Sequence, residues 1–132
     1  MDGGRFIKRV EELSGLDRER AELTTRATLV MLGTRIDPGE ADDLAAQLPD
    51  SLAACLPHEG EAERFGPDEF KRRVARIVPL ANDQAPKAIR AVFTALSEAV
   101  TEGELRQVLG QLGADYEPLV GLPTGTHAHA SR

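Results

Sequence analysis

The residues best suited to metal binding or nucleophilic catalysis are three histidines and one cysteine. His58 lies in a polar stretch broken by proline and glycine, and His127 and His129 follow the last hydrophobic pattern of the chain. A metal ligand or general base needs packing and neighbouring hydrogen bonds to position it. Cys55 corresponds to Leu119 at a spacing of 64 residues that recurs through the chain, which indicates a small core residue rather than a nucleophile. We therefore expect no metal site, no cofactor and no catalytic residue among these four.

Acidic side chains are the next candidates, because the chain has 22 Asp and Glu residues against 16 Lys and Arg. Neighbouring carboxylates act as acid and base where burial separates their pKa values. The pairs Asp42/Asp43 and Glu11/Glu12 fall on predicted helices, and the glutamates at positions 59, 61 and 63 fall in a polar linker. Helix dipoles and solvent account for acids in such places. No partner group accompanies any pair, so the chain is not expected to be an enzyme.

Basic residues on two predicted helices could contact phosphate groups. One set is Arg5, Lys8 and Arg9, and the second set, a candidate basic surface, is Lys71, Arg72, Arg73 and Arg76. Acids interrupt both sets, residues 59–76 contain five acids and five bases, and the net charge of the chain is -6. This balance favours a solvated mixed-charge face over a nucleic-acid surface. Nucleic-acid association through these helix faces remains the alternative function.

An internal repeat reveals the elements that must position these side chains. Phe70 follows Phe6 by 64 residues, and the same spacing aligns residues 6–56 with residues 70–120 without a gap. Identical pairs include Arg9/Arg73, Arg26/Arg90, Glu40/Glu104, Gln47/Gln111 and Leu48/Leu112. Because the matches include the predicted core positions, we interpret the repeat as a tandem duplication. Repeat 1 is placed at about 5–56, a linker at 57–66 and repeat 2 at about 67–120.

Each repeat is predicted to contain three to four helices and no strand. Apolar residues recur at the helical steps of four and three in both copies, at Phe6, Val10 and Leu13 and again at Phe70, Val74 and Ile77. The later long helix is apolar on nearly all sides over residues 88–100, so a single repeat cannot bury it. We therefore predict an all-α fold in which both repeats pack as one pseudo-two-fold globule. It forms a single domain at 1–122, followed by a flexible tail at 123–132.

A capping signal marks the start of the third helix in each repeat. Asp37 precedes Glu40 by three residues, and Thr101 precedes Glu104 by three. This is the spacing of a capping box, in which the glutamate reaches back to the backbone N–H of the cap residue. We therefore predict helix-capping roles for all four residues.

Two equivalent arginines, Arg26 and Arg90, lie on the margin of the buried face of the second helix in each repeat, about 90° from its centre at 100° per residue. An arginine in such a place runs its stem along the core and donates to a carboxylate or to helix-end carbonyls. We predict that both are structural tethers. A central anion site lined by the pair is the alternative, since arginine also binds carboxylate and phosphate ligands.

The composition excludes several classes of protein. Aromatic residues make up 4% of the chain and tryptophan is absent, which argues against base-stacking surfaces. A single cysteine excludes an intramolecular disulfide. No apolar run approaches the roughly 20 residues needed to span a bilayer, and the first residues lack the order of a secretory signal. We expect a cytoplasmic protein without membrane contact.

The segment that begins Gly39-Glu40 and ends Gln47-Leu48-Pro49, together with Arg26-Ala27-Thr28-Leu29, resembles the bacterial domain-of-unknown-function family numbered 2267. The resemblance covers about residues 6–120, and the second copy departs from the pattern at Gly113, where the first has Pro49. It implies a small all-helical protein with two such copies, and some members resemble modules joined to nucleotide-sensing domains. It implies no activity.

These features favour a non-catalytic binding or regulatory module. A duplicated helical globule offers a groove between its copies or a surface for a partner. The expected partner is a protein or a small molecule, with a second copy of the chain in a homodimer as an alternative. Neither nucleic acid nor a membrane is an expected partner.

Overall fold

The computed structural model describes residues 1–124, which form eight α-helices, one 3₁₀ turn and no strand. The elements in order are α1 (Gly3–Ser14), α2 (Arg18–Arg35), α3 (Pro38–Ala45), α4 (Asp50–Ala53), α5 (Pro67–Ile77), α6 (Gln84–Ala99), α7 (Glu102–Leu112), η1 (Ala114–Tyr116) and α8 (Glu117–Val120). The all-helical prediction is confirmed. Within this described part of the chain, no helix combines the length and the hydropathy needed to cross a membrane.

Aspartates and a glycine fix where the first two helices begin and end. The Asp2 carboxylate accepts a hydrogen bond from the Arg5 backbone N–H at 2.8 Å, and Asp17 accepts one from Arg20 at 2.9 Å. Both α1 and α2 therefore begin with a side-chain cap. Gly15 ends α1 with a φ of 76°, a left-handed conformation that glycine adopts without steric penalty.

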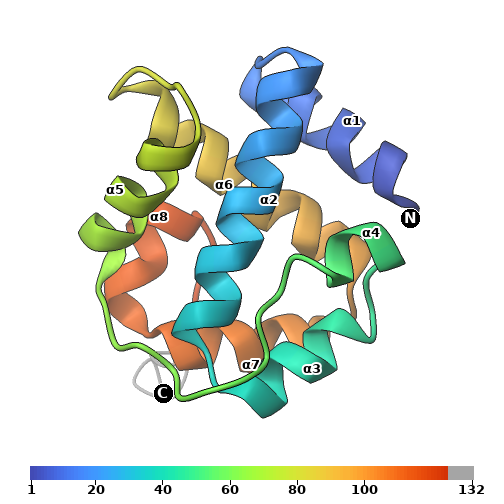
Figure 1. Ribbon diagram of the computed structural model, residues 1–132, viewed down its shortest axis with the longest axis vertical. Helices are drawn as coiled ribbons and strands as arrows, with labels where there is room; N and C mark the ends of the chain where they lie inside the picture. Colours follow the sequence, from blue (N-terminus) through green and yellow to red (C-terminus); the bar gives the residue numbers. More distant parts are fainter. Residues whose placement is uncertain (125–132) are drawn as a thin grey trace.

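The two long helices, α2 and α6, cross at the centre of the molecule and contact each other (Figure 1). α1 packs against both of them, and so does α5. The side chains that fill this centre come from both halves and include Phe6, Leu29, Phe70, Phe93 and Leu96. One hydrophobic cluster therefore joins the two halves, which is what a helix as apolar as α6 requires.

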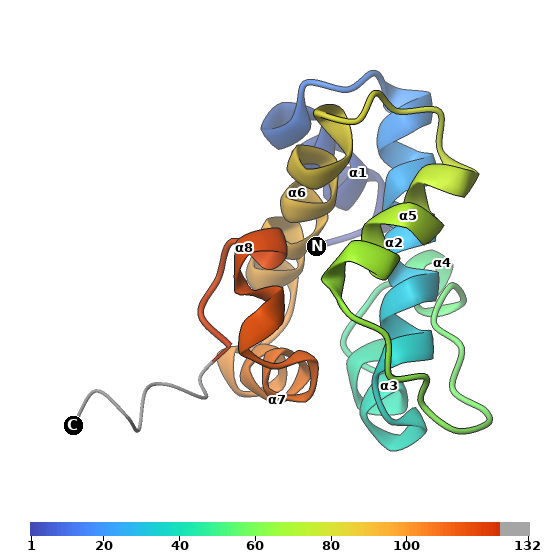
Figure 2. The same ribbon diagram turned by 90° about the vertical axis from the view of Figure 1, so that its left-hand side faces the viewer.

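α3 and α7 lie side by side at the opposite end from the N-terminal turns of α2 and α6 (Figures 1 and 2). Each follows directly from a long helix, α3 after α2 and α7 after α6. Their first residues, Pro38 and Glu102, are 64 positions apart. This contact, which we name the α3–α7 junction, brings equivalent segments of the two halves together.

Residues 57–66 connect the halves without helix and pack on α2. The Glu63 backbone N–H donates to the Thr34 carbonyl at 2.9 Å, and the Phe65 ring lies 6.1 Å from that of Phe70. The connection between the halves is therefore a folded part of the structure.

Two details differ from the sequence predictions. Ile77, expected in the buried stripe, is 48% exposed, because α5 ends at this residue. Thr124, expected in the tail, is 1% exposed, and its N–H and hydroxyl both donate to Glu117 Oε2, at 3.0 and 2.9 Å. Packing continues to Thr124, and the rest of the predicted tail, 125–132, lies outside the described residues.

Candidate functional site

The first turns of α3 and α7 differ from the predicted capping boxes. Thr101 caps α7, since its hydroxyl accepts a hydrogen bond from the Glu104 backbone N–H at 3.2 Å. Asp37 makes no side-chain capping bond, and α3 begins instead with Pro38, whose missing N–H needs no acceptor. The box predicted at Asp37 is therefore wrong, and the one at Thr101 is half formed.

Two glutamines take the place of the glutamates in these boxes. The Asp37 backbone N–H donates to Gln111 Oε1 at 2.8 Å, and the Thr101 backbone N–H donates to Gln47 Oε1 at 2.8 Å. These are the N–H groups that a capping-box glutamate would accept from. Each glutamine reaches across the α3–α7 junction to the opposite half, so the bonds are reciprocal. The side chains of Glu40 and Glu104 are left free for other contacts.

Glu40 and Glu104 turn toward each other at the junction, with Asp43 beside them. Carboxylate oxygens of all three residues lie within 4.8 Å of one another. Asp43 follows Glu40 by three residues, which places both on one face of α3. Glu104 is buried, with 8% of its surface exposed, whereas Asp43 is exposed. We name these three residues the junction carboxylates.

The junction holds a proton on Glu104 at neutral pH. Burial raises the pKa of Glu104 from 4.5 to about 8, and a hydrogen bond to Glu40 and the negative charges of Glu40 and Asp43 raise it further toward that value. The Oε2 atoms of Glu40 and Glu104 are buried, and neither has a hydrogen-bond donor in residues 1–124. Chemically, such a group of oxygens can hold a shared proton or a cation.

Sequence analysis missed Arg35, the last residue of α2. It is buried, with 9% of its surface exposed, and donates to three backbone carbonyls, those of Phe65 at 2.8 Å, Gln111 at 3.2 Å and Leu112 at 3.4 Å. Its guanidinium also lies 5.4 Å from the centre of the Tyr116 ring. Arg35 thus binds the C-terminal end of α7 to α2. Its position among apolar residues at a helix end was the available signal, but the second repeat has Ala99 there.

The equivalent arginines Arg26 and Arg90 make different contacts. Arg90 Nη2 donates to the Pro118 carbonyl at 2.8 Å, and its stem lies so close to Gly121 that a Cβ there would come within 2.5 Å of Arg90 Cδ. Arg26 pairs along its own helix with Glu22 at 3.7 Å, and both side chains are exposed. Arg90 is the tether that the sequence predicts, whereas Arg26 connects no other element through its ion pair.

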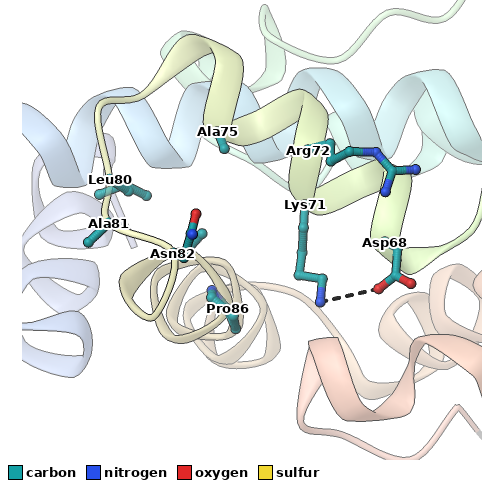
Figure 3. Close-up of a pocket in the computed structure, with 9 residues that line it drawn as sticks. Asp68, Lys71, Arg72, Ala75, Leu80, Ala81, Asn82 and Pro86 are labelled. Atoms are coloured by element: carbon teal, nitrogen blue, oxygen red, sulfur yellow. Dashed lines mark ion pairs between the residues drawn. The ribbon is translucent and has the colours of Figure 1, made fainter.

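The candidate basic surface on α5 is largely neutralised by acids of its own helix. Lys71 Nζ lies 3.2 Å from an Asp68 oxygen, and Arg72 Nε lies 2.9 Å from a Glu69 oxygen. Figure 3 shows the Lys71–Asp68 pair beside a cleft of about 270 Å³ between α5 and the start of α6. Arg76 is the one residue of this surface without an ion pair in residues 1–124.

Arg73 and its counterpart Arg9 are also paired. Arg73 donates to Glu69 at 3.0 Å and to Glu63 at 3.1 Å, and its guanidinium stacks 4.0 Å from the centre of the Phe65 ring. Arg9 donates twice to Glu98, at 2.8 and 2.9 Å. Hydrogen bonds from these arginines hold the pKa of Glu69 and of Glu98 below the ordinary range. Cations paired in this way offer less to a phosphate backbone.

The histidines and the cysteine lie apart from the junction carboxylates or outside the described structure. His58 Nδ1 lies 2.7 Å from an Asp42 oxygen on the surface. Cys55 is half-buried against the core, its thiol donates to the Ser51 carbonyl at 3.7 Å, and burial raises its pKa. A raised pKa disfavours the reactive thiolate. His127 and His129 lie outside the described residues.

Comparison with known families gives one match. A family model described as "Uncharacterized conserved protein (DUF2267)" matches residues 4–119, and the matched region includes both halves and all the junction carboxylates. The match confirms the resemblance found in the sequence. Comparison with curated proteins finds no match.

Proposed function

The chain belongs to the DUF2267 family of uncharacterized conserved proteins, and from this premise we propose that it is a non-catalytic binding or regulatory module. It consists of two copies of one helical unit packed about an approximate two-fold axis. The α3–α7 junction, where equivalent residues of the copies meet, is its ligand site.

The duplication is supported by helix positions and by packing. α1 and α5 begin 64 residues apart, α3 and α7 begin 64 apart, and α2 and α6 end 64 apart. The packing partners correspond in the same way, since α1 contacts α2 and α6 while α5 contacts α6 and α2. A two-fold axis between α2 and α6 relates these contacts, and it would pass between α3 and α7.

The observation that carries the proposal is the reciprocal pair of glutamine bonds. Gln47 binds the Thr101 N–H and Gln111 binds the Asp37 N–H, both at 2.8 Å. Because glutamine supplies these acceptors, a glutamate of each copy is directed into the junction instead of capping its own helix. The chain thereby holds two acids against each other in a buried place, where a solvated surface would keep them apart.

Binding accounts for this arrangement better than catalysis. Two carboxyls of different proton affinity can serve as acid and base, but a substrate must then lie between them. Glu104 is 8% exposed, and its carboxyl is within contact of Glu40. A ligand small enough to enter, or a partner that covers the junction, would instead change how firmly α3 and α7 are held together, which is a means of regulation.

A comparison of retained partners tests the proposal. The full chain, a Glu40→Gln/Glu104→Gln variant and a Glu102→Gln control are immobilised and exposed to extract of the source cells, and the bound proteins and metabolites are identified by mass spectrometry. Glu102 lies on the same helix but is exposed and paired with Arg106 at 3.1 Å. We expect a partner retained by the wild type and the control and lost from the double variant. Retention of the same set by all three would contradict the proposal.

A further inference from the structure

We propose that the junction carboxylates, Glu40, Asp43 and Glu104, bind one hard divalent cation of the Mg²⁺ or Mn²⁺ class. This inference rests on the proposed function, because it names the ligand of the same junction. The sequence predicted no metal site, since it assigned two of these residues to helix capping and the third to a solvated surface.

The donor set is the first support. Each residue offers a carboxylate oxygen, and these oxygens lie within 4.8 Å of one another. Ligands of an octahedral ion with bonds of about 2.1 Å are separated by about 3 Å when adjacent and about 4.2 Å when opposite. Small side-chain rotations therefore bring the three oxygens to one ion. A set of carboxylates without imidazole or thiolate selects a hard cation over zinc or copper.

The second, independent support is a buried oxygen without a partner. Glu104 is more than nine-tenths buried, and its Oε2 has no hydrogen-bond donor in the described residues, nor does Oε2 of Glu40. Buried polar atoms in folded proteins are nearly always paired, so each exception calls for a bound group. The capping role that ordinarily explains a glutamate at this position is filled by Gln47. A cation between the two carboxyls would pair both atoms at once.

The surrounding contacts hold the ligands in place. The Gln47 and Gln111 bonds fix the first turns of α3 and α7 relative to each other, and Arg35 binds the other end of α7. Glu40 and Glu104 thus project from helices whose separation is already set. Asp43 is exposed, so it would complete the ligand set from the solvent side, where water fills the remaining positions of such an ion.

The pseudo-two-fold relation supplies a matched comparison. The counterpart of Asp43 is Gln107, which stands three residues after Glu104 and is exposed. It has the same helical position without the charge. One acid and one amide therefore flank the pair, so the bound ion is expected to lie toward Asp43.

Isothermal titration of the tag-free, chelator-treated full chain with MnCl₂ tests the inference. Mn²⁺ is chosen because the three histidines compete for it less than for Zn²⁺. We expect one Mn²⁺ per chain. Asp43→Asn, an exposed change that leaves the fold intact, and Glu104→Gln, whose fold is checked by circular dichroism, should each weaken binding about tenfold or more. Asp42→Asn on the same helix should leave binding unchanged, because Asp42 faces His58.

Three results would overturn the inference. They are no binding at about 1 mM Mn²⁺, binding unaffected by Asp43→Asn and Glu104→Gln, and binding weakened as much by Asp42→Asn as by Asp43→Asn. The first would leave a shared proton as the role of the pair. The outcome is separable from that of the proposed function. Loss of Mn²⁺ binding with partner retention intact removes only the cation, whereas Mn²⁺ binding without any retained partner removes the proposed module.

Discussion

The α3–α7 junction and the centre of the molecule treat the internal repeat in different ways. At the junction, Asp37 and Thr101 are each bound through the backbone by a glutamine of the other half, and Glu40 faces Glu104. Equivalent residues there contact each other, so a change on one side alters the surroundings of the other. The internal identity of the two halves is therefore kept where the proposed axis passes.

Away from that axis the halves differ. Arg35 ends α2 and binds three carbonyls, whereas Ala99 ends α6. Arg90 is bonded to Pro118, whereas Arg26 pairs only with Glu22 of its own helix. Residues at these places contact unlike neighbours, so the same side chain serves different purposes or none. Identity in the repeat thus indicates shared position and does not by itself indicate shared contacts.

The largest expected effect is the pH dependence that Glu104 gives to stability. Its pKa in the folded chain is raised from 4.5 to about 8, so the folded state binds more protons than the unfolded state between these values. The contribution of Glu104 is therefore fully present below about pH 4.5 and is lost as the pH rises to about 8. Denaturant unfolding should show wild type losing stability relative to Glu104→Gln by up to about 1.4 kcal/mol per pH unit across this window.

The control for this prediction is Glu102→Gln, an exposed acid on the same helix. It should leave the slope unchanged. A Glu104→Gln variant whose stability runs parallel to that of wild type from pH 4.5 to 8 would mean that Glu104 is not held in a desolvated, acidic surrounding.

The next largest effect is the loss of the Arg35 tether. Arg35→Met keeps the apolar stem but leaves three carbonyls without their charged donor, so we expect a loss of about 2 to 3 kcal/mol in the free energy of unfolding. Urea unfolding measures it. Arg106→Met, an exposed arginine of α7, should change stability by about 0.5 kcal/mol or less. Equal effects of the two changes would refute the assignment of Arg35 as a link between the halves.

The reciprocal glutamines should each contribute less. Gln47→Ala or Gln111→Ala removes one exposed hydrogen bond to a backbone N–H, and we expect a loss of about 1 kcal/mol for each. Because both bonds hold the same pair of helices, the double variant should depart from the sum of the singles. Gln107→Ala, exposed on α7, is the control. Additive losses would show that the two bonds act separately.

The smallest effect is expected at the arginine pair on the long helices. Arg90→Met removes a bond to the Pro118 carbonyl and should lower stability by about 1 kcal/mol. Arg26→Met removes an exposed pair within one helix and should have an effect of about 0.3 kcal/mol. Thermal unfolding compares them. A larger effect at Arg26 than at Arg90 would reverse the difference drawn between the two halves.

Much of the fold followed from local patterns, because helix period, proline and cap residues act over short distances. The spacing from Asp37 to Glu40 and from Thr101 to Glu104 placed the starts of α3 and α7 correctly. The partners of these turns could not be predicted, because the acceptors lie 74 and 54 residues away in sequence. Gln47 and Gln111 were visible as an identical pair, yet nothing local distinguishes a glutamine that crosses a junction from one in solvent.

The candidate site was hidden for the same reason. Glu40 and Glu104 each fit a capping box when only one helix is considered, and that local role is complete in itself. Their meeting depends on how α2 and α6 cross, since those helices deliver α3 and α7 to the same end. Arg35 had no equivalent in the second repeat, so a comparison of the halves could not single it out.

A ¹³C NMR titration of the Glu104 side-chain carboxyl most directly tests whether equivalent acids of the two halves face each other in a buried junction. The structure predicts a midpoint near pH 8 for the wild type and a lower midpoint in Glu40→Gln, because the hydrogen bond and the charge of Glu40 both favour the protonated form. A midpoint near the ordinary value of about 4.3, unchanged by Glu40→Gln, would contradict the account.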